Sequence, residues 1–525
     1  MPRSASPFDW HPEPDLVGIH EPSTRPALER LGALAWAAAL DYHFQEALRR
    51  PVGFDTYPEM RRRLFGGGAD PAAAAAAMPS PAPEHPTPSA QVLEEFTRRL
   101  APYQYNASHP RSYSYFTPPA LPLSIVGELL AQWINQGVDV WHAGPSASLV
   151  EEEVIAWLRA VVGYGEGSFG LLTSGGVMAN LIGMTVARDV HLRKLLKLSR
   201  APRGRELEGV RVYASDQTHF SIARALDVLG FPADTLRVVS SDERFRLRGA
   251  PVAEAVAEDR KAGLHPLAIA GVAGSTNTGS VDRVGELADV AEKENLWLHV
   301  DAAYGAAARL SRRDASRVRD LERADSVTVD PHKWFFQTCD IGGLVVKRRE
   351  DLRVTFNRSP EYYRTNRPED EPLHWYQYSI EGTRRFRGLK LWLSWKHLGT
   401  EGLGRLVEMN DDLAAYLARR IRESDDFEAL PEEPELSIVC FRHLPGGREK
   451  ARGLDPVLVD RYQDRLQRAL EVSGEAWVST TKLHGRTWLR AGIINFLSTE
   501  ADIDHTLATL RRLSPEAARG LLSGS

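Results

Sequence analysis

The amino-acid sequence predicts an α/β fold with a largely parallel sheet, and three observations support this. Short apolar runs recur between about residues 125 and 390. Helical patterns separate most of these runs, and fully apolar strands that alternate with helices are typical of a parallel sheet. The chain has 525 residues, of which 43% are hydrophobic and 26% charged, so it can build a large core and is not globally disordered.

The N-terminal part is expected to be helical. Residues 26–49 place apolar side chains near the 3.6-residue helical period, and residues 91–101 do so again. Between them, residues 66–90 are rich in Gly, Ala, Pro and Ser, which predicts a linker or surface insertion, or one short helix in the alanine run. We therefore predict an N-terminal helical segment at residues 1–110.

The central part carries the expected strands of the sheet. They are Val210–Ala214, Leu236–Val239, Leu267–Val272, Leu296–Val300, Ser326–Val329 and Gly343–Val346, with one more short strand running into Thr173. We assign residues 111–400 to one large α/β domain.

The last part of the chain has a different pattern. A long helix is expected at Gly402–Ser424 and another at Glu500–Leu513. Three short strands are expected between them, at Ser437–Arg442, Ala476–Lys482 and Thr487–Asn495. We assign residues 401–525 to a small C-terminal α+β domain.

Charge and composition argue against several classes of partner. The 65 basic and 70 acidic residues give a net charge of −5, which does not favour a nucleic-acid partner. No apolar run approaches the ~18 residues of a membrane span, and the N-terminus lacks the apolar core of a signal peptide. The two cysteines are too few for a disulfide framework. We expect a cytoplasmic protein without a membrane partner or a bound metal.

The sharpest candidate is the lysine that follows the expected strand Ser326–Val329, in the segment Asp330-Pro-His332-Lys333-Trp. Ligands of open parallel sheets bind at the carboxyl ends of the strands. A lysine at such a place suits Schiff-base chemistry. Taken alone, a lysine after a strand is more often a solvated surface residue.

A second strand end carries an acid. The strand Leu296–Val300 leads into Asp301, followed by Ala-Ala-Tyr-Gly. The ordinary interpretation is a capping aspartate at a strand-to-helix turn. The functional interpretation is a partner for a heterocyclic nitrogen, because the pyridine ring of pyridoxal phosphate (PLP) acts as an electron sink when a carboxylate keeps it protonated.

Three further loops complete the pattern. Thr-Ser-Gly-Gly at 173–176 precedes a helical run and can cradle a phosphate with backbone N–H groups. His219 follows a strand and either stacks on a flat ring or is a hydrogen-bonded structural histidine. Ser-Thr-Asn-Thr-Gly at 275–279 is another hydroxyl-rich loop. The dinucleotide fingerprint is absent, and the five segments together supply the parts of a PLP site.

These motifs closely resemble those of the group II PLP-dependent decarboxylases, the family of aromatic-L-amino-acid, histidine and glutamate decarboxylases. The resemblance spans about residues 105–515. Its most specific pieces are His-Val-Asp-Ala-Ala-Tyr at 299–304, Asp-Pro-His-Lys-Trp at 330–334 and Arg-Arg-Phe-Arg-Gly-Leu-Lys at 384–390.

The resemblance implies a PLP-dependent fold of type I, similar to aspartate aminotransferase, with a mostly parallel seven-stranded sheet and a homodimer. It also implies that an L-amino acid is decarboxylated to its amine and CO2. Relatives use aromatic, acidic and aliphatic substrates, and we expect an aromatic or otherwise apolar side chain.

The family's roles carry over to matching residues. Lys333 would form the internal aldimine with PLP, and Asp301 would pair with the pyridine nitrogen. His219 would stack on the ring and help to place the substrate carboxylate. Tyr362 would return the proton to the quinonoid intermediate after CO2 leaves, with Tyr363 as the fallback.

Other matching positions imply binding contacts. The expected cofactor contacts outside the aldimine and the ring are Ser174, Gly175, Thr276, His332 and Asp330. His109 and Ser148 are the expected substrate contacts. Asp330 departs from the family, which commonly has asparagine there, and a carboxylate near a phosphate repels it unless it is turned away or hydrogen-bonded.

Two alternatives remain open at this point. One is an oxidative aldehyde synthase that releases ammonia and peroxide, an outcome that the family associates with loss of the loop tyrosine or a change of the stacking histidine. This chain keeps both residues. The other is a cofactor-binding scaffold without catalysis, against which Lys333, Asp301 and His219 argue. The aromatic stretch Tyr103–Phe116 either lines the substrate pocket or belongs to the core or a dimer interface.

Overall fold

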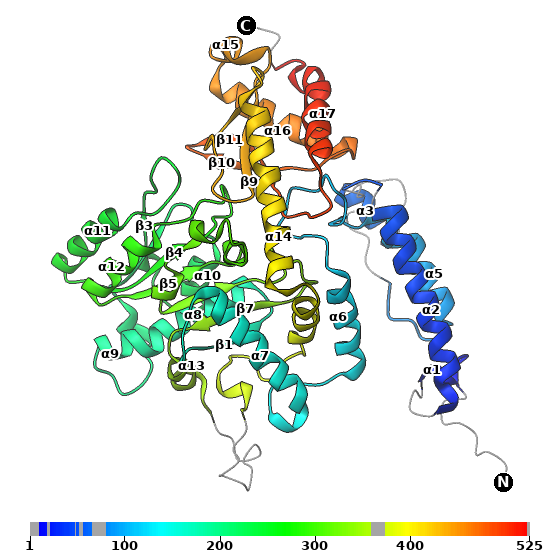
Figure 1. Ribbon diagram of the computed structural model, residues 1–525, viewed down its shortest axis with the longest axis horizontal. Helices are drawn as coiled ribbons and strands as arrows, with labels where there is room; N and C mark the ends of the chain where they lie inside the picture. The colour runs from blue at the N-terminus through cyan, green and yellow to red at the C-terminus, as the bar shows by residue number, and fades with distance from the viewer. Residues whose placement is uncertain are drawn as a thin grey trace. The chain divides into compact units, whose positions relative to one another are not determined.

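The structure is a computed structural model that describes residues 10–17, 22–47, 49–51, 56–65, 80–358 and 373–521 (Figure 1). Contacts divide the chain into two compact units. The first comprises residues 1–112, 466–478 and 497–517, and the second comprises residues 113–465, 479–496 and 518–525. The three-part division expected from the sequence stays a prediction.

The first unit is helical. Its helices are α1 (Pro14–Val17), α2 (Arg25–Asp41), α3 (Tyr57–Phe65), α5 (Ser89–Arg99) and nearly all of α17 (Glu500–Ala518). Helix α2 begins with a proline in its first turn, where the missing N–H has no helical acceptor to lose. These elements confirm the helices predicted at 26–49 and 91–101. The alanine run at 72–77 lies outside the described residues.

The second unit contains the seven-stranded sheet. Its order is β1 (Phe169–Thr173), β7 (Gly342–Val346), β6 (Ser326–Val329), β5 (Trp297–Asp301), β4 (His265–Val272), β2 (Val210–Ser215) and β3 (Leu236–Val239). The pairs from β6 to β3 are parallel, and β7 is antiparallel to both of its neighbours. The predicted fold class and its mostly parallel sheet are confirmed.

Helices cover the sheet, as its continuous apolar strands require. Every residue of β1, β5, β6 and β7 is buried. The covering helices that contact strands are α7 (Pro145–Val162), α8 (Gly176–Val186), α11 (Gly249–Lys261), α12 (Val284–Glu294) and α13 (Arg349–Phe356), and α10 (Ser221–Val228) packs on α8. Because water reaches neither face of these strands, their backbone groups must pair within the sheet.

A long helix, α14 (Gly388–Arg422), runs alongside α6 (Pro122–Ile134) (Figure 1). The sequence predicts only its second part. The helix is broken at Gly399, which adopts φ 65°, in the left-handed region that glycine tolerates best. Nothing lies within 4 Å of the place where a Cβ would stand, so the backbone angle and not the space calls for glycine.

The second unit also holds an antiparallel sheet in the order β10 (Ser479–Leu483), β11 (Arg486–Gly492), β9 (Ile438–His443) and β8 (Phe427–Ala429). His484 and Gly485 join β10 to β11, and both have positive φ, as a tight hairpin turn requires. Helix α15 (Gly447–Ala451) also belongs to this unit, whereas α16 (Pro456–Ser473) is divided between the two units at Leu466. Among the described helices, none is both long and apolar enough to traverse a lipid bilayer.

Candidate active site

The carboxyl ends of β1, β2, β4, β5 and β6 meet at one edge of the sheet, because these strands are parallel to one another. Each is followed by a segment that the sequence singled out. These segments bring Ser174, His219, Thr276, Asp301 and Lys333 to the same edge. The strand-end prediction therefore holds for the five segments as parts of the fold.

Lys333 lies in the turn after β6, where its N–H donates to the Asp330 carbonyl oxygen at 2.9 Å. Its Nζ is 3.7 Å from Asp330 Oδ2 and 5.4 Å from the centre of the Phe116 ring. The side chain is 21% exposed, so a small molecule can reach it. Within the described residues, no hydrogen bond holds this amine, which leaves it available for a covalent bond.

Asp301 is the last residue of β5, and it is buried. Its Oδ1 accepts the Ala303 N–H at 3.1 Å, which is the local turn-capping role that the sequence left open. Its Oδ2 accepts a hydrogen bond from Asn180 Nδ2 at 2.7 Å. Both carboxyl oxygens of Asp301 therefore act as hydrogen-bond acceptors.

His219 stands half-buried just before α10. Its Nδ1 lies 2.8 Å from Ser221 Oγ, and the Ser221 N–H donates to the same nitrogen at 3.3 Å. Burial is the largest of the effects that lower the pKa of His219. The imidazole is therefore neutral near pH 7, which suits a ring that stacks on another flat ring.

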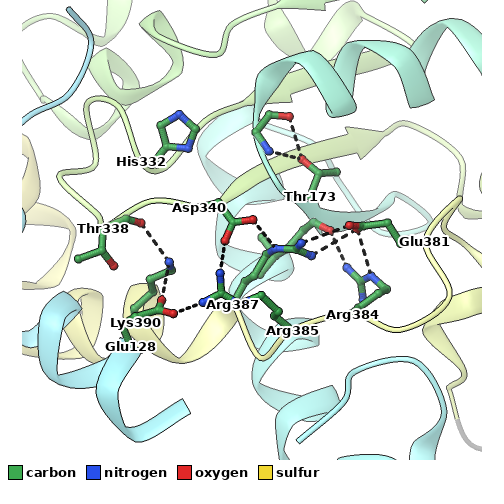
Figure 2. A network of polar contacts seen from close by, with 12 residues as sticks. Glu128, Thr173, His332, Thr338, Asp340, Glu381, Arg384, Arg385, Arg387 and Lys390 are labelled. Atoms are coloured by element: carbon green, nitrogen blue, oxygen red, sulfur yellow. Dashed lines mark hydrogen bonds and ion pairs between the residues drawn. The ribbon is translucent and has the colours of Figure 1, made fainter. Parts of the chain in front are cut away.

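The Ser174–Gly176 turn is packed too closely for larger residues. A Cβ on Gly175 would lie 3.1 Å from His332 Cε1, and a Cβ on Gly342 would lie 2.5 Å from the Gly175 Cα. Thr173 Oγ1 accepts the Gly175 N–H and donates to the Gly175 carbonyl (Figure 2). The turn is thus held rigidly at the N-terminus of α8, where backbone N–H groups favour an anion.

Asp330 is fully buried beside this turn. Its Oδ2 accepts the Gly176 N–H at 3.0 Å, so the carboxylate is hydrogen-bonded to the first residue of α8. Burial raises the pKa of Asp330, although His332 and Lys333 act in the opposite direction. A carboxyl group that takes up a proton more readily repels a neighbouring phosphate less. An aspartate at position 330, where the family commonly has asparagine, is therefore compatible with a phosphate site.

Comparison with known proteins decides the family. Residues 71–444 match the pyridoxal-dependent decarboxylase conserved domain. The chain belongs to the pyridoxal-dependent decarboxylase family. The aromatic-L-amino-acid decarboxylase of Bacillus atrophaeus is 32% identical over 437 residues, which are 83% of this chain and 88% of that one. The phenylacetaldehyde synthase of Petunia hybrida is 29% identical over 79% of this chain and 83% of its own.

Among solved structures, Oryza sativa TDC with PLP and tryptamine superposes on this decarboxylase with a TM-score of 0.84. The two are 25% identical, and the match covers 94% of this chain and 99% of that one. This decarboxylase is thus a carboxy-lyase that uses PLP to decarboxylate an amino acid.

The strand-end site of this decarboxylase fits the cofactor. Asp330 Oδ1 and His332 Nδ1 are buried next to the cradle and find no hydrogen-bond partner among the described residues, although they lie only 3.1 Å apart. A phosphate oxygen would give the histidine nitrogen an acceptor. Burial lowers the pKa of His332, as it does that of His219.

The third family motif of this decarboxylase, at 384–390, holds the loop that follows Lys333 (Figure 2). Asp340 accepts hydrogen bonds from Arg385 and Arg387. Lys390 is buried, and its Nζ reaches the Thr338 carbonyl at 3.0 Å and Glu128 Oε2 at 2.7 Å. These contacts tie the loop to α6 and α14, so the motif shapes the site from outside.

Two residues near the site were not predicted from the sequence. Asn180 hydrogen-bonds to Asp301, and Arg490 on β11 stands with its guanidinium carbon 4.8 Å from the centre of the Phe116 ring. Arg490 Nε donates to the Thr276 carbonyl at 2.7 Å, while Nη2 is buried and finds no acceptor among the described residues. Burial lowers the pKa of Arg490. Each of these two residues is a single polar residue within an apolar run of the sequence, and this is the signal that could have indicated them.

The structure does not test the roles of three predicted site residues. Tyr362, with its fallback Tyr363, lies outside the described residues. His109 belongs to the first unit, where its Nδ1 accepts the Arg111 N–H at 3.1 Å and burial lowers its pKa to about 4. Ser148 is buried in the first turn of α7, and its Oγ has no hydrogen-bond partner in the described part of the chain. Their roles stay predictions.

Proposed function

We propose that this decarboxylase converts an aromatic L-amino acid to its amine and CO2. The observation that carries the proposal is an aromatic wall beside Lys333. The Phe116 ring lies 5.4 Å from Lys333 Nζ, and the Tyr304 ring follows at 4.8 Å from Phe116. Trp334 stacks on Tyr304 at 4.8 Å, and both of these rings are buried, so they support Phe116, the half-buried ring that a substrate would meet. A flat apolar side chain gains offset or edge contacts against such a wall.

The named relatives support the same substrate class. One is called an aromatic-L-amino-acid decarboxylase, and the TDC structure contains tryptamine, an aromatic amine. A substrate of this class would also need a site for its carboxylate. We assign this role to His219 together with Arg490, whose buried Nη2 has an unused donor among the described residues.

The remaining roles follow from chemistry that PLP supplies when bound, which is an electron sink for the bond that breaks. Lys333 would hold the cofactor and release it to the substrate amine. Asp301 would keep a proton on the ring nitrogen. Ser174 and Gly175, with His332 and Asp330 beside them and Thr276 from the next loop, would bind the cofactor. His109 and Ser148 would contact the substrate.

The deciding experiment measures CO2 release from a panel of L-amino acids with added PLP, with peroxide measured in the same wells. We expect CO2 from tryptophan, tyrosine or phenylalanine, an equal amount of amine and no peroxide. Release only from glutamate, diaminobutyrate or cysteine sulfinate would overturn the aromatic assignment. Stoichiometric peroxide would identify the aldehyde-forming reaction, which is not favoured although an aldehyde synthase is among the relatives.

Replacing Tyr362 by phenylalanine is expected to slow amine formation by about 10²-fold, the usual effect of losing a proton donor. CO2 release should fall less, and peroxide should appear, because the reaction then lacks its normal proton source. Amine, CO2 and peroxide are measured together. The neighbouring Tyr363→Phe is the matched control and should behave as wild type; the reverse pattern would move the role to Tyr363.

We also propose that the protein is a homodimer with a second copy against α6. This helix turns Ser124, Gly127 and Ala131 inward and exposes an apolar face made of Ile125, Leu129, Leu130, Trp133 and Ile134. Trp133 is 64% exposed, which is unusual for so large an apolar side chain unless another surface covers it.

Trp133→Asp is therefore expected to halve the mass in solution, from about two chains of 58.4 kDa to one. Light scattering after size exclusion measures it. The control is Val228→Asp, an equally exposed apolar residue on α10, which should leave the mass unchanged. A wild-type protein of one-chain mass would contradict the proposal.

For location, we propose the cytoplasm. Cys440 is a buried free thiol and Cys339 is free as well, a state that a reducing compartment preserves.

A further inference from the structure

A buried asparagine joins two of the expected cofactor-binding residues, Asp301 directly and His219 through Ser221. Asn180 on α8 is 1% exposed. Its Nδ2 lies 2.7 Å from Asp301 Oδ2 and 2.8 Å from Ser221 Oγ. Its Oδ1 lies 2.6 Å from Thr328 Oγ1 and 3.0 Å from His299 Nε2. The amide thus uses two donors and two acceptor positions, its full capacity.

The direction of these hydrogen bonds can be worked out from one end of the network. The Trp297 indole only donates, and its Nε1 lies 3.0 Å from Ser326 Oγ. Ser326 Oγ accepts this proton, so its own hydroxyl proton is available for His299 Nδ1, 2.8 Å away. Burial lowers the pKa of His299 to about 4, so the ring is neutral and its one proton sits on Nε2. His299 Nε2 consequently donates to Asn180 Oδ1.

The other end gives the same answer. An ionised Asp301 only accepts, so the Asn180 NH2 group must face it, and the Asn180 oxygen must face Thr328 and His299. The second N–H of this group then donates to Ser221 Oγ. The orientation that Asp301 requires thus agrees with the one that His299 requires, and both residues belong to β5.

The consequence reaches His219. Ser221 Oγ accepts from Asn180, and its own hydroxyl proton is available for His219 Nδ1, 2.8 Å away. The Ser221 backbone N–H points to the same nitrogen at 3.3 Å. Nδ1 is therefore an acceptor, and the single proton of the neutral imidazole is on Nε2.

We propose that Asn180 is a positioning residue that fixes the Asp301 carboxyl group and, through Ser221, holds His219 as the neutral tautomer with its proton on Nε2. This proposal rests on the proposed function, in which His219 contacts the substrate carboxylate. In this form the free nitrogen of His219 offers an N–H to the substrate carboxylate. It cannot act there as a base.

The first test reads the tautomer directly by ¹⁵N NMR of the PLP-loaded, histidine-labelled enzyme without substrate. The His219 signals are assigned by their loss in His219→Gln. We expect an unprotonated Nδ1 and a protonated Nε2. A proton on Nδ1 in the wild-type enzyme would overturn the proposal. CO2 release plays no part in this reading, so its outcome is independent of whether the proposed substrate is right.

The second test addresses Asn180 itself. Asn180→Asp keeps the shape but puts a carboxylate where the NH2 group was, so it competes for the Ser221 proton and repels Asp301. We expect the ratio of the two His219 tautomers to shift by about three- to tenfold towards Nδ1–H, the effect of one lost hydrogen bond. The dissociation constant of PLP should rise, and kcat should fall more than KM rises.

Matched variants separate this role from mere packing. Thr328→Val is nearly isosteric and removes only a donor to Asn180 Oδ1, so the His219 tautomer should stay as in the wild type. Ser221→Ala leaves the contact between Asn180 and Asp301 intact but removes the relay, so it should shift the tautomer and leave PLP affinity nearly unchanged. Should Asn180→Asp fail to fold, Ser221→Ala decides. An unshifted tautomer in Ser221→Ala would overturn the relay.

Discussion

Replacing Lys333 by alanine is expected to lower the rate of CO2 release by at least about 10⁴-fold, as removal of a covalent catalytic group does. The reason is the place of its amine, which lies at the edge where the parallel strands end and is reachable from solvent. Lys390, which holds the same loop, is not available to replace it, because it is fixed by Glu128 and the Thr338 carbonyl.

Two measurements check this expectation. One is the rate of CO2 release from the best amino acid of the panel. The other is mass spectrometry of tryptic peptides after borohydride treatment with PLP, which should find the cofactor on the Lys333 peptide of the wild type and on no peptide of the variant. Lys293→Ala, at a side chain that is 81% exposed, is the control and should match the wild type in both. A variant with wild-type turnover would contradict the assignment.

The positions of Lys333 and Asp301 could be predicted because Lys333 follows a short buried strand and Asp301 ends another. Strands of this kind are recognisable locally, since β5 and β6 are short, buried throughout and rich in apolar or β-branched residues. Parallel pairing then brings their carboxyl ends to one edge without any knowledge of the contacts between them. The predicted strands and the mostly parallel sheet are confirmed for the same reason.

Asn180 and Arg490 could not be predicted in this way. Asn180 acts through partners on β5, β6 and α10, and Arg490 reaches the Thr276 carbonyl from a strand that is more than 200 residues later in the chain. Local patterns carry no information on such contacts, because they are created only when the elements pack together. The start of α14 at Gly388 was missed for a related reason. The family motif at 384–390 contacts Asp340 and Glu128, which are distant in the sequence, so the local pattern does not indicate the start of the helix.

A buried ion pair holds β1 in the place where it delivers the cradle. Arg384 and Glu151 are both almost fully buried, and two Arg384 nitrogens bind the two Glu151 oxygens at 2.5 and 3.1 Å. Arg384 Nη2 also donates to the Leu172 carbonyl at 2.6 Å, and Glu151 Oε1 accepts the Leu172 N–H at 2.9 Å. The pair therefore forms hydrogen bonds with both the N–H and the carbonyl of Leu172, the residue that precedes Thr173.

Arg384→Met is expected to lower the free energy of unfolding by about 3–5 kcal/mol, because it leaves the Glu151 carboxylate buried without its partner. Urea unfolding followed by circular dichroism measures the change. The matched control is Arg405→Met, which breaks the exposed pair with Glu401, and it should cost less than about 1 kcal/mol.

The double variant Glu151→Met/Arg384→Met distinguishes the buried charge from lost packing. Replacing both partners removes the uncompensated charge, so part of the stability should return, although the Leu172 backbone groups then lose their side-chain contacts. A free energy of unfolding that is lower than that of Arg384→Met by a further ~2 kcal/mol would mean that the hydrogen bonds to Leu172 dominate. The explanation by an uncompensated buried charge would then be wrong. In either case PLP binding should weaken in step with stability, since the gripped strand ends where the phosphate cradle begins.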